Sequence, residues 1–188
     1  GGPEGPDPLS RAEVLLDLPQ QAIAQRSYSL GQAMVSPDGQ WLAWTEDVMG
    51  RGSHDLYIQN LRTRRLAPER IRGVLEGFAW SADSRHVFYV RHDPVTLHSG
   101  AVWRHERGRD ESKDVLVHDE PDKTLFVEVR PSASRRYVLI DIHGSDTAEL
   151  RAAAGLAPGA SVRQAATPAA GTAGSMSATP SPSSAARG

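Results

Sequence analysis

Short runs of alternating or continuously apolar residues, each preceded by a turn of small and polar residues, recur along the middle of the chain. The three copies are Ser36-Pro37-Asp38-Gly39 before 41–45, Ser81-Ala82-Asp83-Ser84 before 86–90, and Ser132-Ala133-Ser134-Arg135 before 137–142. Runs of this length predict β-strands, because successive side chains of a strand point to opposite faces of a sheet. The turn residues fit, since proline presets φ, aspartate bonds to nearby backbone and glycine allows positive φ.

The spacing of these turns predicts a repeat. They begin at residues 36, 81 and 132, which gives repeat lengths of 45 and 51 residues. A repeat of about 45 residues made of short strands is typical of a β-propeller blade, which has four antiparallel strands. Further strands are expected at 32–35 and 55–61 in the first copy, and at 77–80, 101–105 and 114–118 in the second.

The predicted fold class is therefore all-β, an incomplete propeller of about two and a half four-stranded antiparallel blades. The expected blades are 28–72, 73–120 and an incomplete third at 121–151. Residues 1–27 are expected to form a lead-in. A short helix at Pro19–Arg26, with proline in its first turn, and an extended segment at 12–18 are the two elements expected there.

The composition changes at the end of the third copy. Residues 1–150 hold all 23 acidic residues and 18 of the 21 basic ones, a net charge of −5. From Ala152 the chain is almost entirely Ala, Gly, Pro, Ser and Thr, with too little apolar area to offset the entropy of ordering. We expect 152–188 to be a disordered tail, with a flexible linker to a further domain as the alternative.

Composition and charge exclude several classes of function. The 188 residues include no cysteine, so a disulfide framework and a cysteine-based zinc site are both excluded. No apolar run approaches eighteen residues, and Gly1–Pro8 lacks the features of a signal peptide. A net charge of −2 gives no electrostatic argument for nucleic acid. We therefore expect neither a nucleic-acid nor a membrane partner.

No catalytic or metal-binding constellation is recognisable. A serine nucleophile on a strand-to-helix elbow needs G-x-S-x-G, and the nearest match, Gly159 to Arg163, lacks the last glycine. The histidines show no H-E-x-x-H pattern; they are His54, His86, His92, His98, His105, His118 and His143. Asp141 and His143 share a strand face, but two ligands are fewer than an ordinary site needs. We expect hydrated histidines at strand ends and in loops, and assign no catalytic, cofactor-binding or metal-binding residue and no cofactor.

Two acidic clusters, Glu46-Asp47 and 118–122, come directly after predicted strands. One interpretation is that they line an electronegative cavity that attracts basic peptides. The other, which we favour, is that they form hydrated turns, since acidic residues are common turn formers.

Two further groups have a structural and a binding interpretation. The run Arg62 to Arg65 is a candidate phosphate site, but the negative charge around it favours a solvated hairpin turn between two strands. Trp41 and Trp44 are three residues apart and so face opposite sides of a strand. We expect them to fill the packing between blades rather than to hold a ligand.

An ordered set of motifs resembles the N-terminal propeller of the prolyl oligopeptidase family, and within it the oligopeptidase B branch most. The stretches that carry the resemblance are 28–31, 35–39, 61–69, 78–84, 93–97, 102–105, 114–117, 120–122 and 147–149. The most specific stretch is Asp93-Pro94-Val95-Thr96-Leu97 leading to Val102-Trp103-Arg104-His105, whereas SPDG at 36–39 occurs in many propellers. Residues 14–17 resemble the segment that enters the first blade, although Pro19 stands where the family usually has asparagine.

The resemblance implies a seven-bladed propeller that caps an α/β-hydrolase domain in a cytoplasmic serine peptidase cleaving short peptides after basic residues. The family's Ser, Asp and His, and the acidic residues that read the basic side chain, belong to that second domain and have no counterpart here. We therefore expect a substrate-gating fragment that is inactive alone. Its implied partners are short peptides and the missing hydrolase domain.

Two other hypotheses stay open at this point. One is a non-enzymatic propeller that binds a partner, and the other is a non-functional truncated gene product. Blades bury their faces against neighbours, so an unclosed array leaves its end faces wet. Trp41, Trp44, Phe78, Trp80 and Phe88 are expected to belong to these blade faces, and self-association through uncovered faces is a further expectation.

Overall fold

The computed structural model describes residues 14–17, 27–93, 100–144, 148–153 and 163–164. These residues form eleven strands and one short 3-10 turn, and contain no α-helix. The strands are β1 (Ser29–Val35), β2 (Trp41–Asp47), β3 (His54–Asn60), β4 (Leu66–Trp80), β5 (His86–Arg91), β6 (Ala101–Glu106), β7 (Val115–Asp119), β8 (Phe126–Pro131), β9 (Val138–His143), β10 (Ala148–Ala153) and β11 (Arg163–Gln164). The 3-10 turn, η2, is Glu111–Lys113. The all-β, antiparallel fold class predicted from the sequence is confirmed.

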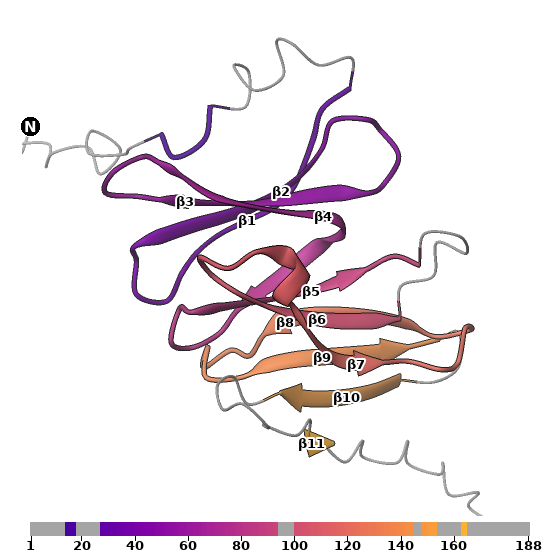
Figure 1. Ribbon diagram of the computed structural model, residues 1–188. Helices are drawn as coiled ribbons and strands as arrows, with labels where there is room; N and C mark the ends of the chain where they lie inside the picture. The colour runs from indigo at the N-terminus through magenta and orange to yellow at the C-terminus, as the bar shows by residue number, and fades with distance from the viewer. Residues whose placement is uncertain (1–13, 18–26, 94–99, 145–147, 154–162, 165–188) are drawn as a thin grey trace, which may run out of the picture.

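The strands divide into consecutive blades, although two of these share one sheet (Figure 1). The first seven strands pair in chain order, each antiparallel to the next. The 15-residue β4 pairs with β3 over its first half and with β5 over its second. It is therefore the outer strand of the first blade (β1 to β4) and the inner strand of the second (β4 to β7).

The change of blade within β4 has a local cause. Gly73 has a φ of 67°, and the pairing with β5 shifts register between Val74 and Phe78. Positive φ is readily adopted only by glycine, and register shifts bend and twist a strand. The sequence predicts a blade boundary at 72/73, whereas in the structure one uninterrupted strand, β4, crosses that position.

The third blade is a separate sheet with the order β11-β10-β9-β8. Its outer strand, β11, lies in the segment expected to be disordered, and β10 continues to Ala153. The blade therefore reaches beyond the expected boundary at residue 151. Backbone groups on the free edge of β10 can pair with any non-proline residue, so composition did not indicate this pairing. The remainder of 152–188, and the helix expected at 19–26, lie outside the described residues.

The three repeated turns have one hydrogen-bonding pattern. In each, the first serine N–H donates to a carbonyl five residues later, at distances of 2.8, 2.9 and 2.9 Å. The fourth residue has positive φ in all three: Gly39 (70°), Ser84 (61°) and Arg135 (56°). The sequence motif is thus a true structural repeat, although only its first copy has glycine where the backbone favours it.

Two apolar cores hold the blades together. The core between the first and second blades contains Ala43, Leu56, Ile58, Ile71, Val74, Phe78, Trp80, Val87 and Tyr89. The core between the second and third contains Ala79, Phe88, Val90, Val102, Val127, Val129, Val138, Ile140 and Ile142. Adjacent residues of β5, such as Val87 and Phe88, therefore pack into different cores, because successive side chains of a strand point to opposite faces of the sheet.

The five aromatic residues expected on blade faces lie on such faces, but none is fully exposed to solvent: four are buried and Trp41 is half-buried. Phe78, Trp80 and Phe88 lie in the two cores, and Trp41 packs against the first of them. Trp44 faces the other side of β2, is 3% exposed and stacks on Tyr57 with ring centroids 5.5 Å apart. The expectation that Trp41 and Trp44 point to opposite sides is confirmed.

Two glycines of the inner strands provide a matched test of the blade packing. A Cβ at Gly31 would lie 2.5 Å from Thr45 Oγ1 and 2.7 Å from Glu76 Cγ, whereas one at Gly77 would meet nothing nearer than 3.6 Å. Thr45 Oγ1 is held by hydrogen bonds from Gln32 N and to Glu76 O, so it cannot move without breaking them. We expect Gly31→Ala to lower the free energy of unfolding by about 1–3 kcal/mol, and Gly77→Ala to leave it nearly unchanged. Urea unfolding followed by circular dichroism measures both, and equal effects would contradict this packing.

Candidate functional site

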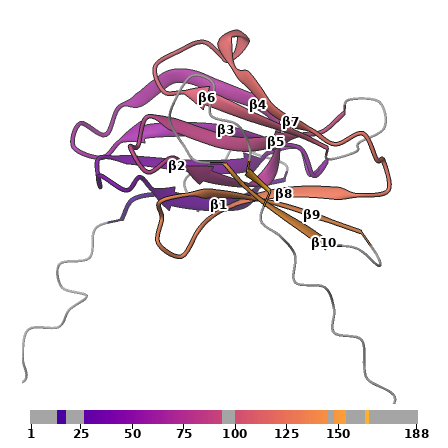
Figure 2. The same ribbon diagram turned by 90° about the horizontal axis from the view of Figure 1, so that it is seen from below.

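The inner strands of the three blades line a common groove. It is open to solvent and has a volume of about 590 Å³. Its lining residues are Gly31 and Gln32 of β1, Leu75, Glu76 and Gly77 of β4, Val90 of β5, and Glu128, Val129 and Arg130 of β8. Figure 2 shows β1 and β8 on the same side of the molecule. This groove is the candidate functional site, because every blade of the fragment contributes to it.

The groove carries a negative charge balance. Glu76, Glu128 and Arg130 line it and are all exposed. Arg130 is paired with Asp141 of the neighbouring strand, with Nε 2.5 Å from Oδ2. Its charge is therefore compensated within the blade, while the two glutamates face the groove without an ion-pair partner among the described residues. The site thus favours a cationic ligand.

Hydrogen bonds between inner strands position this groove. The amide of Gln32 pairs with the backbone of Phe78 as a strand would: Nε2 donates to Phe78 O at 3.0 Å, and Oε1 accepts from Phe78 N at 3.2 Å. The Thr45 hydroxyl donates to Glu76 O at 2.6 Å. Each bond connects a side chain of the first blade to β4 in its second-blade half.

Two more bonds join the blades near the repeated turns. Trp80 Nε1 donates to Met34 O at 3.1 Å, and Asp38 N donates to Ser84 Oγ at 3.0 Å. The bonds made by Gln32, Trp80 and Asp38 all connect residues 46 positions apart, about one repeat. Equivalent places in successive blades are therefore linked directly.

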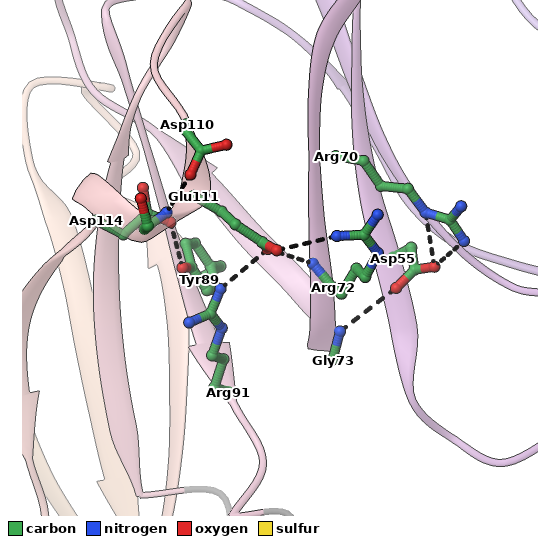
Figure 3. Close-up of polar contacts among 10 residues, drawn as sticks. Asp55, Arg70, Arg72, Gly73, Tyr89, Arg91, Asp110, Glu111 and Asp114 are labelled. Atoms are coloured by element: carbon green, nitrogen blue, oxygen red, sulfur yellow. Dashed lines mark hydrogen bonds and ion pairs between the residues drawn. The ribbon is translucent and has the colours of Figure 1, made fainter.

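The loop between β6 and β7, residues 107–114, forms a wedge between the outer parts of the first and second blades. The Arg107 guanidinium lies 3.9 Å from the Trp41 ring centroid, and Gly108 N donates to Glu69 Oε1 at 2.8 Å. Glu111 accepts from Arg72 of β4 and Arg91 of β5, with N–O distances of 3.1–3.3 Å (Figure 3). We call this loop the interblade wedge.

A buried polar cluster anchors the base of the interblade wedge. His105 is fully buried, and its Nδ1 lies 2.7 Å from Asp114 Oδ1. Glu69 Oε1 lies 3.9 Å from His105 Nε2, and the Tyr89 hydroxyl donates to Asp114 Oδ2 at 2.6 Å. Four strands or loops thus bring two carboxylates to one imidazole.

The surroundings of His105 favour its charged form. Burial alone would lower the pKa of the imidazole, but the carboxylates of Asp114 and Glu69 outweigh burial and raise it to about 9. Burial likewise opposes the charged form of Glu69, yet the interactions with His105 and the Gly108 amide lower the pKa of its carboxyl. Burial and the bond to Asp114 raise the pKa of Tyr89. At neutral pH the cluster therefore holds a cationic histidine between two anions.

The structure corrects one sequence-based prediction about the histidines. They were expected to be hydrated, but His54, His86 and His105 are buried, at 7%, 9% and 0% exposure. The reason is that the partners of His105 come from other strands and a distant loop, so sequence spacing could not reveal them. His98 lies outside the described residues. No group of three or more possible metal ligands occurs within the part of the chain described.

The other candidate groups behave as structural elements. Asp47 accepts from the amides of Met49, Gly50 and Gly52, so it is a turn former as favoured above. The expected hydration was wrong, because Asp47 and Glu120 are buried, at 3% and 6% exposure. Arg62 to Arg65 lies in the turn between β3 and β4, which confirms the hairpin interpretation. Asp141 pairs with Arg130, and His143 packs against Phe126 with ring centroids 6.2 Å apart. The groove residue Gln32 carried no recognisable motif and was missed.

Comparison with known proteins agrees with this architecture. Residues 3–171 match the family model for the prolyl oligopeptidase N-terminal β-propeller domain. The chain is 31% identical over 147 residues to a dipeptidyl aminopeptidase BI of Pseudoxanthomonas mexicana, covering 78% of this chain and 20% of the relative. It is 27% identical over 144 residues to a protease 2 of Moraxella lacunata, covering 73% and 20%.

A solved structure supports the fold. Oligopeptidase B from Leishmania major superimposes with a TM-score of 0.78 at 20% sequence identity, covering 86% of this chain and 23% of that one. The chain belongs to the prolyl oligopeptidase family, as part of its N-terminal β-propeller domain. It spans about a fifth of the length of the curated relatives it matches. No helix among the described residues has the length and apolar character needed to cross a bilayer.

The buried cluster predicts a pH dependence of stability. The pKa of His105 is raised from 6.5 to about 9 on folding. Its contribution to the free energy of unfolding is therefore complete below about pH 6.5 and is lost as the pH rises through about 9. The contribution is on the order of 3 kcal/mol. Urea unfolding between pH 6 and 9.5 measures it. The free energy of unfolding of His105→Gln should be lower at pH 6 and nearly constant over this range, whereas the control His92→Gln, at a half-buried histidine outside the cluster, should keep the wild-type slope. An unchanged slope in His105→Gln would contradict the assignment.

Proposed function

We propose that this chain is the first part of the substrate-gating propeller of an oligopeptidase B-like serine peptidase that cleaves short peptides after basic residues. The proposal rests on the inner-strand groove. All three blades contribute residues to this groove, and its unpaired charged groups are carboxylates. A groove of that sign attracts peptides with basic side chains. Short peptides and the hydrolase domain of the parent enzyme are the proposed partners.

The chain itself is proposed to be inactive. The described residues bring together no nucleophile, base and oxyanion donors, and the chain spans about a fifth of its curated relatives. Incubation of the purified 188-residue chain with an arginyl-aminomethylcoumarin peptide should give no turnover above buffer. Turnover that co-purifies with the chain and is blocked by a serine-directed fluorophosphonate would overturn this placement of the active site.

Binding to the groove is measurable without catalysis. A fluorescent octapeptide with two arginines should bind the chain more tightly than the same peptide with two glutamines, because two groove carboxylates face it. The double variant Glu76→Gln/Glu128→Gln should lower the affinity for the arginyl peptide several-fold, by loss of charge–charge attraction. Glu106→Gln, which neutralises a half-buried carboxylate outside the groove, serves as the control. Equal affinity for both peptides would contradict a charge-selective groove.

A non-enzymatic binding propeller is the second candidate, because the structure shows a blade array and a groove but no catalytic centre in its described part. The coding sequence downstream of residue 151 discriminates between the two. A G-x-S-x-G elbow several hundred codons further supports the peptidase, and further blades followed by a stop codon support the binding protein.

We also propose that the isolated chain self-associates. Phe126, Val115 and Leu116 are large apolar side chains with exposures of 56%, 48% and 47%. Light scattering should show a mass that grows with concentration, and a constant monomer mass would contradict it. The cytoplasmic location that we propose rests on the family resemblance and is tested by fractionation of the source cells.

A further inference from the structure

A second, smaller groove lies on the outer rim of the first blade, and it shares no residue with the inner-strand groove. Its volume is about 250 Å³. Apolar lining comes from Trp41 at the start of β2 and from Leu66, Ala67 and Pro68 at the start of β4, and Leu66 is 56% exposed. Two guanidinium groups, those of Arg65 and Arg107, complete it. We call this site the rim groove.

Arg107 is held in place for binding. Its guanidinium stacks on Trp41 at 3.9 Å, and its Nε donates to Ser84 O at 3.5 Å. A guanidinium that stacks on an aromatic face keeps its in-plane N–H donors available for a carboxylate. The two terminal nitrogens of Arg107 have no hydrogen-bond partner in the described part of the chain. Holding the group in advance lowers the entropy lost on binding.

The acidic groups near the rim groove are only partly engaged, because Glu69 Oε2 is buried without a hydrogen-bond partner among the described residues. Glu69 lines it, but its Oε1 accepts from Gly108 N and lies beside His105. Asp38, whose carboxyl feels the charge of Arg107, accepts from Ser36 Oγ and Gln40 N. Neither Arg65 nor Arg107 forms an ion pair with any described carboxylate. The groove therefore presents two guanidinium groups that form no ion pair, beside an apolar wall, together with the single carboxylate of Glu69, which lies next to His105.

Asn60 supplies the rim groove with a neutral hydrogen-bond donor, in addition to the apolar wall and the two guanidinium groups. Its Oδ1 accepts from the backbone N–H and the hydroxyl of Thr63, at 2.9 and 3.1 Å. This fixes the orientation of the amide, so Nδ2 is a donor without a partner in the described residues. Asn60 lines the rim groove, and such a donor suits a peptide carbonyl oxygen.

We propose that the rim groove binds the C-terminal residue of a peptide that ends in an apolar side chain. The side chain occupies the wall formed by Trp41, Leu66 and Pro68. The terminal carboxylate pairs with Arg107 and Arg65, and Asn60 donates to the preceding carbonyl. The function proposed above does not use the rim groove. The proposal for the rim groove is therefore independent of the proposal for the inner-strand groove.

The probe for this proposal is N-acetyl-L-phenylalanine, titrated into the ¹⁵N-labelled 188-residue chain and followed by amide and indole N–H shifts. We expect saturable binding with shifts at Trp41 and Gly108. N-acetyl-L-phenylalanine amide lacks the charge and should bind at least about tenfold more weakly, because charge-assisted bonds are the strong ones. 3-Phenylpropionate keeps the ring and the carboxylate but has no amide carbonyl, and it should also bind more weakly.

Variants locate the binding. Arg107→Gln and Arg65→Gln should each lower the affinity for N-acetyl-L-phenylalanine by about tenfold. Because Arg65 is exposed, its variant tests the site even if the Arg107 variant is poorly folded. Arg62→Gln removes a charge from the same turn but does not line the groove, and should bind within twofold of wild type. The proposal is overturned if the acid does not bind, if the amide binds as well, if Arg62→Gln weakens binding equally, or if 3-phenylpropionate binds as tightly as the peptide acid.

Discussion

The structure depends on one strand that serves two blades. β4 completes the first blade with its first half and begins the second with the rest, so the two blades are joined through one strand, in which Val74 pairs with both β3 and β5. Side chains reinforce this connection, because the Gln32 amide pairs with the backbone of Phe78 as a further strand would. The inner-strand groove exists only while these contacts hold β1 and β4 together, and the second apolar core places β8 beside them.

The outer parts of the blades are joined by different means. Toward the periphery of a propeller the blades diverge, and here the interblade wedge fills the space with ionic and polar groups. At the buried end of this wedge Asp114 pairs with His105 of β6, which also lies beside Glu69. At its outer end Glu111 pairs with Arg72 and Arg91. A buried charged group is tolerated only when it is paired, which explains why three chain segments converge on one imidazole.

The blade repeat was predictable from the sequence because it depends on local chemistry. The turns at 36, 81 and 132 and the apolar runs after them identify strands without any knowledge of their neighbours. The contacts that define the sites are non-local: Gln32 contacts Phe78, one blade repeat away, and His105 lies beside Glu69 of a different strand. Hydration of His54, His86 and His105 was therefore predicted wrongly, and β11 was missed because edge pairing uses backbone groups that composition does not report.

Native-state hydrogen exchange tests the central claim most directly, since it measures the opening free energy of each amide. If β4 makes the first two blades one cooperative unit, the slowest amides of β2 and β5 should exchange with the same free energy and the same denaturant dependence. Gln32→Leu should lower both together. Exchange of the first-blade amides at a free energy several kcal/mol below that of the second blade, with β5 unaffected by the substitution, would contradict the account.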